Sequence, residues 1–111
     1  MGERPDAVFG ALSDATRRAV VARLADGPAT PTDLAEHLPV SRQAVSKHLE
    51  VLREAGLVRS DRAGREHRYT LVTAPLASAV SWITDVGDRW DERLDALRRQ
   101  LSSPTPDPPD A

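Results

Sequence analysis

The sequence predicts a mainly α domain of the α+β class, in which several helices accompany one short two-stranded β-hairpin. Three observations lead to this fold class. Only four of the 111 residues are aromatic, so leucine, valine and alanine must build most of the core, which favours helices. Apolar residues recur at helical spacing along most of the chain. One segment instead shows the alternation and turn residues of a hairpin.

The length of the chain suits one domain. We expect this domain to span residues 6–102, after an N-terminal extension, 1–5, and before a proline-rich tail, 103–111. The final stretch, SSPTPDPPDA, holds four of the nine prolines and no large apolar residue, which predicts disorder. No apolar run approaches the roughly 20 residues that cross a bilayer, and MGERPDAVFG lacks the pattern of a secretion signal. We therefore expect a cytoplasmic protein that does not associate with a membrane.

The first two helices are predicted near the N-terminus. Residues 6–12, DAVFGAL, form a short apolar helix candidate. Asp14 is expected to be the N-cap of the second helix, because apolar residues follow it at helical spacing and Gly27-Pro28 ends the run. These apolar residues are Val20, Val21 and Leu24.

A strong helix start signal follows at residues 30–33, TPTD. Thr30 can cap the helix, Pro31 fits its first position, and Asp33 stands where the reciprocal acid of a capping box belongs. Pro39 stops this helix after Leu38.

The next helix begins after Ser41, runs over 42–55, and ends at Gly56, which suits the left-handed position beyond a helix C-terminus. Helices 31–38 and 42–55, joined by three or four residues, form a helix-turn-helix unit. Apolar side chains recur at spacings of four and three on the second helix and should face the core: Val45, Leu49 and Leu52. The opposite side carries Arg42, Gln43, Ser46, Lys47 and Glu50.

The pattern changes after this helix. LVRSDR and REHRYTLV are typical of two strands around a turn at Ala63-Gly64. A hairpin this short is marginal alone and must pack against the helices. Its tip carries Arg62 and Arg65.

A long final helix is predicted from Thr73-Ala74-Pro75 to Leu101. Its apolar residues are spaced alternately by four and three positions, as in the seam of a coiled coil. The helix would be roughly 40 Å long at 1.5 Å per residue. A domain this small cannot cover such a stripe, and an uncovered apolar stripe of that length predicts association with another chain. The expected interface residues are Phe9, Leu12, Leu76, Val80, Ile83, Trp90, Leu94, Leu97 and Leu101.

Basic residues concentrate in one part of a chain whose formal net charge is −2. Residues 41–68 carry seven basic side chains, among them Lys47, the only lysine, and four acidic ones. The remainder carries eight basic and thirteen acidic side chains. Charges act locally because salt screens them beyond about 8–10 Å. This local excess is compatible with binding a polyanion, and equally with a solvated surface.

The order of the elements favours the first of these interpretations. A winged helix-turn-helix has two helices, then a two-stranded ribbon, then a further helix. This chain has that order, with basic groups on the second helix and on the ribbon tip. One helix of such a fold fits the major groove of double-stranded DNA, where arginine pairs with guanine and glutamine with adenine. His48 borders the core on the helical wheel, so a structural role is the alternative to a direct contact between His48 and DNA. The expected DNA-binding residues are Thr32, Ser41, Arg42, Gln43, Ser46, Lys47, His48, Arg62, Arg65 and Arg68.

The sequence also resembles the ArsR-type winged helix-turn-helix repressors over about residues 6–101. The stretches that carry the resemblance are LSDATR at 12–17, DLA at 33–35, SRQAVSKHL at 41–49 with Leu52, AGLV at 55–58 and the wing at 65–71. The resemblance implies a protein that binds its operator as a homodimer and usually represses transcription. It also implies that the first and last helices pair across the dimer.

Many members of that family sense metals, and this chain departs from their pattern. Those members use cysteines beside the helix-turn-helix, or histidines and carboxylates on the last helix. Here residues 32–37, TDLAEH, contain no cysteine, and the last helix contains no histidine. Its acids interleave with Arg89, Arg93 and Arg98, which predicts a solvated, ion-paired face. We therefore expect a metal-independent member with no metal site and no cofactor. The residues do not identify whether an effector ligand binds.

Two other functions stay open at this point. One is a repressor that responds to a metal or small ligand held by oxygen atoms at the dimer interface. The other is a winged-helix module that binds protein, with the long helix as its docking element. An enzyme is not expected, because the sequence has no Ser-His-Asp spacing, no glycine-rich phosphate loop, no paired catalytic carboxylates and no cysteine.

Overall fold

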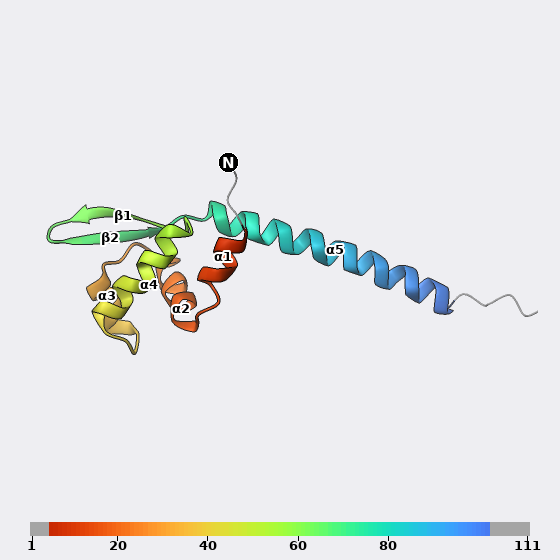
Figure 1. Ribbon diagram of the computed structural model, residues 1–111, viewed down its shortest axis with the longest axis horizontal. Coiled ribbons are helices and arrows are strands. Elements are labelled where there is room, and N and C mark those ends of the chain that lie inside the picture. Colours follow the sequence, from red (N-terminus) through yellow and green to blue (C-terminus); the bar gives the residue numbers. More distant parts are fainter. Residues whose placement is uncertain (1–4, 103–111) are drawn as a thin grey trace, which may run out of the picture. The chain divides into compact units, whose positions relative to one another are not determined.

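The computed structural model describes residues 5–102, so the expected tail, 103–111, and most of the expected N-terminal extension lie outside the described residues. The chain divides into two units, Met1–Ala79 and Val80–Ala111, which we describe separately. The fold class is confirmed: five helices accompany one two-stranded antiparallel sheet within the described residues (Figure 1). In chain order the elements are α1 (Pro5–Ala11), α2 (Ala15–Leu24), α3 (Pro31–His37), α4 (Arg42–Glu54), β1 (Val58–Ala63), β2 (Glu66–Leu71) and α5 (Ala74–Ser102).

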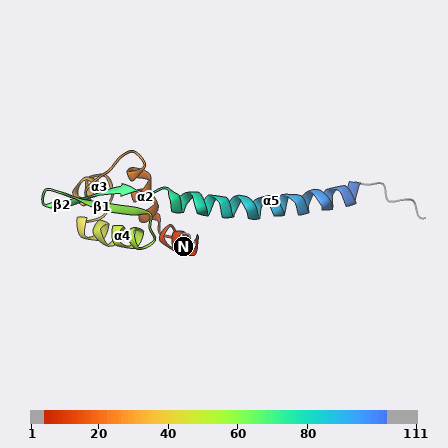
Figure 2. The ribbon, with the colours of Figure 1, turned by 90° about the horizontal axis from the view of Figure 1, so that it is seen from above.

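The core of the first unit is built around α4. This helix contacts α1, α2, α3 and β1, and β1 runs alongside it in Figure 2. The three apolar residues predicted to face the core from α4 are fully buried, which confirms that prediction. The buried apolar side chains are Val8, Ala11, Val20, Leu24, Leu34, Val45, Leu49, Leu52, Leu57, Val58 and Ala79.

The predicted helix caps are confirmed. The Asp14 carboxylate accepts from the Arg17 N–H at 3.0 Å, and the Ser41 hydroxyl accepts from the Ala44 N–H at 3.1 Å. At α3 the capping box is complete. The Thr30 hydroxyl accepts from the Asp33 N–H and the Asp33 carboxylate accepts from the Thr30 N–H, both at 3.1 Å. These bonds satisfy backbone donors that the first turn of a helix leaves unpaired.

Several boundaries differ from the prediction by one residue. The first, third and fourth helices end at Ala11, His37 and Glu54, each one residue earlier than predicted. The first helix begins at Pro5, because proline is tolerated in the first turn, where its missing N–H needs no partner. The hairpin turn consists of Gly64 and Arg65, one position later than predicted, because Ala63 pairs with Glu66. Gly64 has φ +65°, a left-handed conformation that glycine adopts without steric cost.

The hairpin, or wing, packs against the helical part of its unit, as predicted for so short a sheet. Ala29, in the loop before α3, pairs with Tyr69 of β2. The Ala29 N–H donates to the Tyr69 carbonyl at 3.1 Å, and the Tyr69 N–H donates back at 2.8 Å. Because this bridge lies on β2, it attaches the wing directly to the loop that leads into α3.

The helix α5 begins in the first unit and continues through the second. In the first unit its Pro75 and Ala79 side chains are buried, and Leu76 is half-buried against the core. In the second unit large apolar side chains are exposed, from Val80 to Leu101. The predicted ion-paired face is confirmed by Arg89–Asp85 at 3.0 Å and Arg98–Asp95 at 3.4 Å. No helix among the described residues is long and apolar enough to cross a membrane.

The capping box predicts how acid acts on stability. Hydrogen bonds from the backbone and then the side chain of Thr30 hold the pKa of Asp33 below its usual value of 3.8. A lowered carboxyl pKa stabilises the fold above the unfolded-state value, and this contribution disappears as pH falls through the folded-state value. The variant Asp33→Asn should therefore be less stable than the wild type near neutral pH, with a difference that shrinks below about pH 4.

Urea unfolding followed by circular dichroism from pH 7 to pH 2.5 measures this difference. The control is Asp88→Asn, which removes an exposed carboxylate from α5. A stability difference for Asp33→Asn that stays constant over this pH range would contradict the assignment.

Candidate nucleic-acid interface

The exposed side of α4 carries the polar residues predicted to meet DNA. Arg42, Gln43, Ser46 and Lys47 are all exposed, and the buried apolar residues lie on the other side of the helix. The sequence separates the two sides because apolar residues recur at helical spacing. The N-terminal half of α4 therefore presents two cations, an amide and a hydroxyl to solvent.

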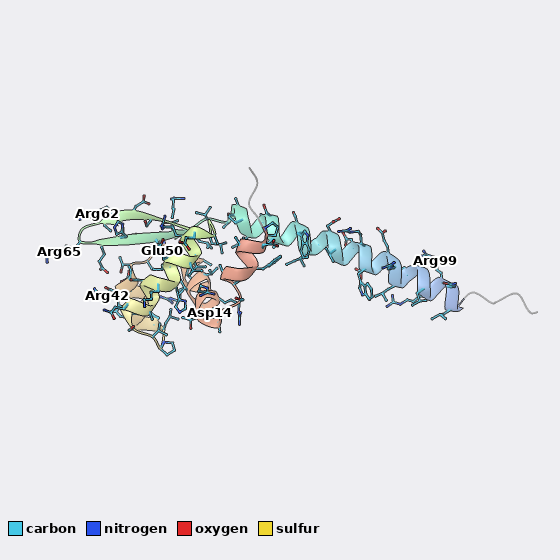
Figure 3. The ribbon with its side chains drawn as sticks, in the orientation of Figure 1. Asp14, Arg42, Glu50, Arg62, Arg65 and Arg99 are labelled. Carbon is cyan, nitrogen blue, oxygen red and sulfur yellow. The ribbon has the colours of Figure 1, made fainter. Side chains whose placement is uncertain are left out.

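A hollow lies between this side of α4 and the wing, and we call it the wing hollow. It brings together five of the ten residues predicted to bind DNA, from two segments of the sequence. Figure 3 shows Arg42 at the start of α4 and Arg65 at the wing tip, extending at the same end of the first unit. The residues that line the wing hollow are Pro31, Arg42, Gln43, Ser46, Lys47, Arg65, Glu66, His67 and Tyr69.

The positive charges of the wing hollow are available to a ligand. Among the described residues, no carboxylate forms an ion pair with Arg42, Lys47 or Arg65. By contrast, Arg53 at the other end of α4 is paired with Glu50, whose pKa this hydrogen bond lowers. Unpaired cations can attract phosphate without first breaking a protein contact.

Three of the predicted residues have hydroxyl or guanidinium groups that already bond within the protein. Ser41 caps α4. The Thr32 hydroxyl donates to Oε1 of Glu66 at 2.7 Å, so it joins α3 to the wing. At the wing tip, Arg62 Nε donates to the Gly64 carbonyl at 3.1 Å, within its own turn. The remaining acceptor lone pairs and guanidinium donors of these groups can still meet DNA.

His48 lies on the side of α4 that faces α2. It is half-buried, and its Nδ1 lies 3.4 Å from Arg17 Nη1 and 4.0 Å from Asp14 Oδ1. The Nε of Arg17 also donates to the Ala11 carbonyl at 2.6 Å. This group therefore links the end of α1, the start of α2 and α4. The N–H of Arg17 holds the pKa of Asp14 below its usual value.

The last predicted DNA-binding residue, Arg68, is exposed on β2. Its positive charge also contributes to lowering the pKa of Asp33, after the hydrogen bonds from Thr30. Arg68 therefore acts on the N-terminal end of α3, and it is not among the residues of the wing hollow.

Sequence reasoning missed the roles of two residues. Arg17 was part of the matching stretch at 12–17, but its link to His48 joins positions 31 residues apart. Glu66 was counted only as one of the acids of the basic segment. Glu66 lines the wing hollow, and its carboxylate accepts a hydrogen bond from Thr32, 34 positions away. Neither contact has a local pattern that could have predicted it.

Comparison with known proteins agrees with this geometry. Residues 12–61 match the family described as a helix-turn-helix domain. The HTH-type transcriptional regulator Rv2034 of Mycobacterium tuberculosis is 43% identical over 99 residues, which cover 89% of this chain and 90% of that protein. The transcriptional repressor SdpR of Bacillus subtilis strain 168 is 34% identical over 87 residues, which cover 78% of this chain and 97% of SdpR.

A solved structure is similar over almost the whole chain. The ArsR-like transcriptional regulator from Rhodococcus sp. RHA1 matches with a TM-score of 0.76 and 40% identity, covering 91% of this chain and 94% of that one. The fold and the exposed polar side of α4 define a winged helix-turn-helix protein. The chain belongs to the ArsR-type winged helix-turn-helix regulators of transcription.

Proposed function

We propose that the protein is a homodimeric repressor that binds a palindromic operator in double-stranded DNA and does not sense metals. The observation that carries the proposal is the set of exposed, unpaired cations and amide on the N-terminal half of α4, facing the wing hollow. A helix of this kind enters the major groove and reads base edges with its N-terminal residues. The repressor activity is proposed because SdpR is a repressor.

In this proposal the residues of α4 and of the wing have different tasks. Arg42 and Gln43 read bases, since arginine pairs with guanine and glutamine with adenine in the major groove. Lys47 neutralises a phosphate. Arg62 and Arg65, on either side of the Gly64 turn, contact the sugar-phosphate backbone and add affinity more than sequence choice.

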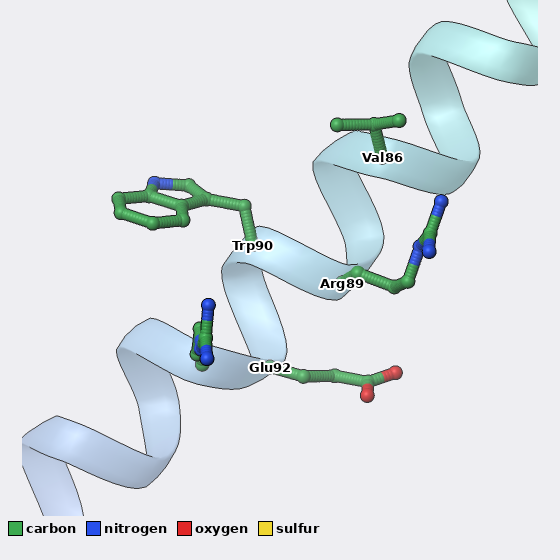
Figure 4. A pocket seen from close by; sticks show the side chains of 5 residues that line it. Val86, Arg89, Trp90 and Glu92 are labelled. Carbon is green, nitrogen blue, oxygen red and sulfur yellow. The ribbon is translucent and has the colours of Figure 1, made fainter.

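The proposal of a homodimer is supported by the second unit. The predicted interface side chains of α5 include Val80 at 60% exposure, Ile83 at 53% and Trp90 at 56%. Figure 4 shows Trp90 projecting from the side of α5 opposite to Glu92. We call the side of α5 that carries these exposed apolar residues its apolar side. A second copy would cover the apolar side and hold two recognition helices about 34 Å apart, one turn of DNA.

Trp82 and Val86 widen the apolar side beyond the predicted seam. They are 50% and 38% exposed, and they follow one another at a spacing of four on α5. Gly87 lies between Ile83 and Trp90 in the four-and-three spacing of the seam. Apart from its chain neighbours and the nearby backbone of α5, no described atom comes within 4 Å of the position that a Cβ would take there. Glycine inside a helix costs about 1 kcal/mol relative to alanine. Close approach of a second helix would account for a glycine that packing within the chain does not require.

The different tasks of the α4 residues predict two kinds of loss in DNA affinity when these residues are replaced by alanine. Arg42→Ala or Gln43→Ala should cost about 1–3 kcal/mol on the operator and relax specificity at one position in each half-site. Lys47→Ala should weaken all duplexes alike and lower the slope of log affinity against log salt by about 1. Fluorescence anisotropy over a salt series, on a fragment found by footprinting upstream of the protein's own gene, measures both.

The charge-matched control for these variants is Arg23→Ala, which removes an exposed cation from α2. It should leave the affinity for the operator unchanged. If the three α4 variants keep wild-type affinity while circular dichroism shows them folded, α4 is not the recognition helix.

The dimer predicts that a residue far along α5 controls DNA binding. Leu94→Asp should place a charge in the seam, dissociate the dimer and abolish operator binding. The control Ser81→Asp places the same charge on the polar side of α5, near the ion-paired Asp85. It should preserve both the dimer and operator binding. Sedimentation at micromolar concentration measures the assembly. A wild type that sediments as a 12.1 kDa monomer refutes the dimer.

Metal independence is a separate prediction. The sequence has no cysteine, and the described residues contain no group of three or more potential ligand side chains arranged to hold a metal. Zinc and copper sites in proteins are built from such groups. Operator affinity should therefore be the same with a chelator and with micromolar zinc, copper or arsenite. A reversible change of tenfold or more with any of them would favour a metal-responsive repressor.

A further inference from the structure

Among the described residues, hydrogen bonds join the wing to the helix-turn-helix and the loop before it at two places. Near the middle of β2, the backbone of Tyr69 pairs with that of Ala29, which lies in the loop before α3. Closer to the tip, the half-buried Thr32 and Glu66 side chains are joined by the hydrogen bond of 2.7 Å. Since Glu66 is the first residue of β2, only the two-residue turn lies beyond this second attachment.

The position of Glu66 is unexpected on electrostatic grounds. It is the one carboxylate among the residues that line the wing hollow, where Arg42, Lys47 and Arg65 supply positive charge. A carboxylate there repels the phosphates that these cations attract. The hydrogen bond to Thr32 offers a reason for a carboxylate at this position.

We propose that Glu66 is a positioning residue for DNA binding that acts through Thr32. The inference rests on the proposed function. The hydrogen bond holds the wing tip against α3, which itself packs on α4. The wing hollow is therefore already shaped for a segment of DNA backbone before the duplex arrives. A wing tip that is already ordered in the free protein loses less conformational entropy when DNA binds, which lowers the free-energy cost of binding. Arg65 next to the attachment, and Lys47 across the hollow, then act on the same backbone segment.

Two substitutions separate the hydrogen bond from the charge. Glu66→Gln and Glu66→Ala both remove the negative charge, but only glutamine keeps an oxygen that can accept from the Thr32 hydroxyl. On the operator fragment, Glu66→Gln should bind at least as tightly as the wild type. Glu66→Ala should bind about threefold to tenfold more weakly than Glu66→Gln, which corresponds to one net hydrogen bond.

Substitutions at the donor supply an independent comparison. Thr32→Val keeps the shape of the side chain and removes the hydroxyl, so it should weaken binding about threefold to tenfold. Thr32→Ser keeps the hydroxyl and should bind more tightly than Thr32→Val. The double variant Thr32→Val with Glu66→Ala should bind no more weakly than whichever single variant has the lower operator affinity. The reason is that both substitutions remove the same hydrogen bond. Additive losses would show that the two residues act separately.

A measurement without DNA tests the attachment itself. Backbone ¹⁵N relaxation reports motion on the picosecond to nanosecond timescale. The amides of Gly64 and Arg65 should be more mobile in Glu66→Ala and Thr32→Val than in the wild type, and unchanged in Glu66→Gln. Equal mobility in Glu66→Ala and Glu66→Gln, or equal operator affinity, overturns the proposal. If the wild type binds no duplex, the proposed function fails instead, and the relaxation data still decide whether this hydrogen bond orders the wing.

Discussion

The candidate DNA interface depends on the burial of one side of α4. Val45, Leu49 and Leu52 are completely buried, and each such side chain stabilises the fold by roughly 1.5–3 kcal/mol. Because side chains leave a helix at fixed angular intervals, burying this side of α4 also fixes which residues point into solvent. The contacts of α4 with α1, α2, α3 and β1 therefore set both the stability of the first unit and the presentation of Arg42, Gln43 and Lys47.

Most of the fold could be predicted because its signals are local. The caps at Asp14, Thr30 and Ser41, and the left-handed Gly56, act on backbone groups a few positions away and leave a recognisable spacing. The division of α4 into apolar and polar sides also follows from spacing alone. The hairpin turn was placed one residue early, because Ala63-Gly64 and Gly64-Arg65 are both compatible with the composition. The pairing of Ala63 with Glu66 decides between them.

The candidate site was predicted as a set of residues and not as an arrangement. Sequence alone placed basic groups on α4 and the wing, but the wing hollow requires the wing to lie against α3. That position depends on the Ala29–Tyr69 bridge and the Thr32–Glu66 hydrogen bond, whose partners are far apart in the sequence. For the same reason the sequence identifies Glu66 only as one of the four acids of residues 41–68. It places His48 at the border of the core but does not identify its partners, Arg17 and Asp14.

Fourteen of the fifteen cations of the chain are arginines, and Lys47 is the single lysine. Guanidinium groups stay protonated and do not undergo the acylation that converts a lysine ammonium into a neutral amide. Among the side chains, an amine-acylating reagent or a lysine acetyltransferase would therefore find one target, which lies in the wing hollow. The use of arginine elsewhere confines this covalent chemistry to one charge of the candidate interface and leaves the others unchanged.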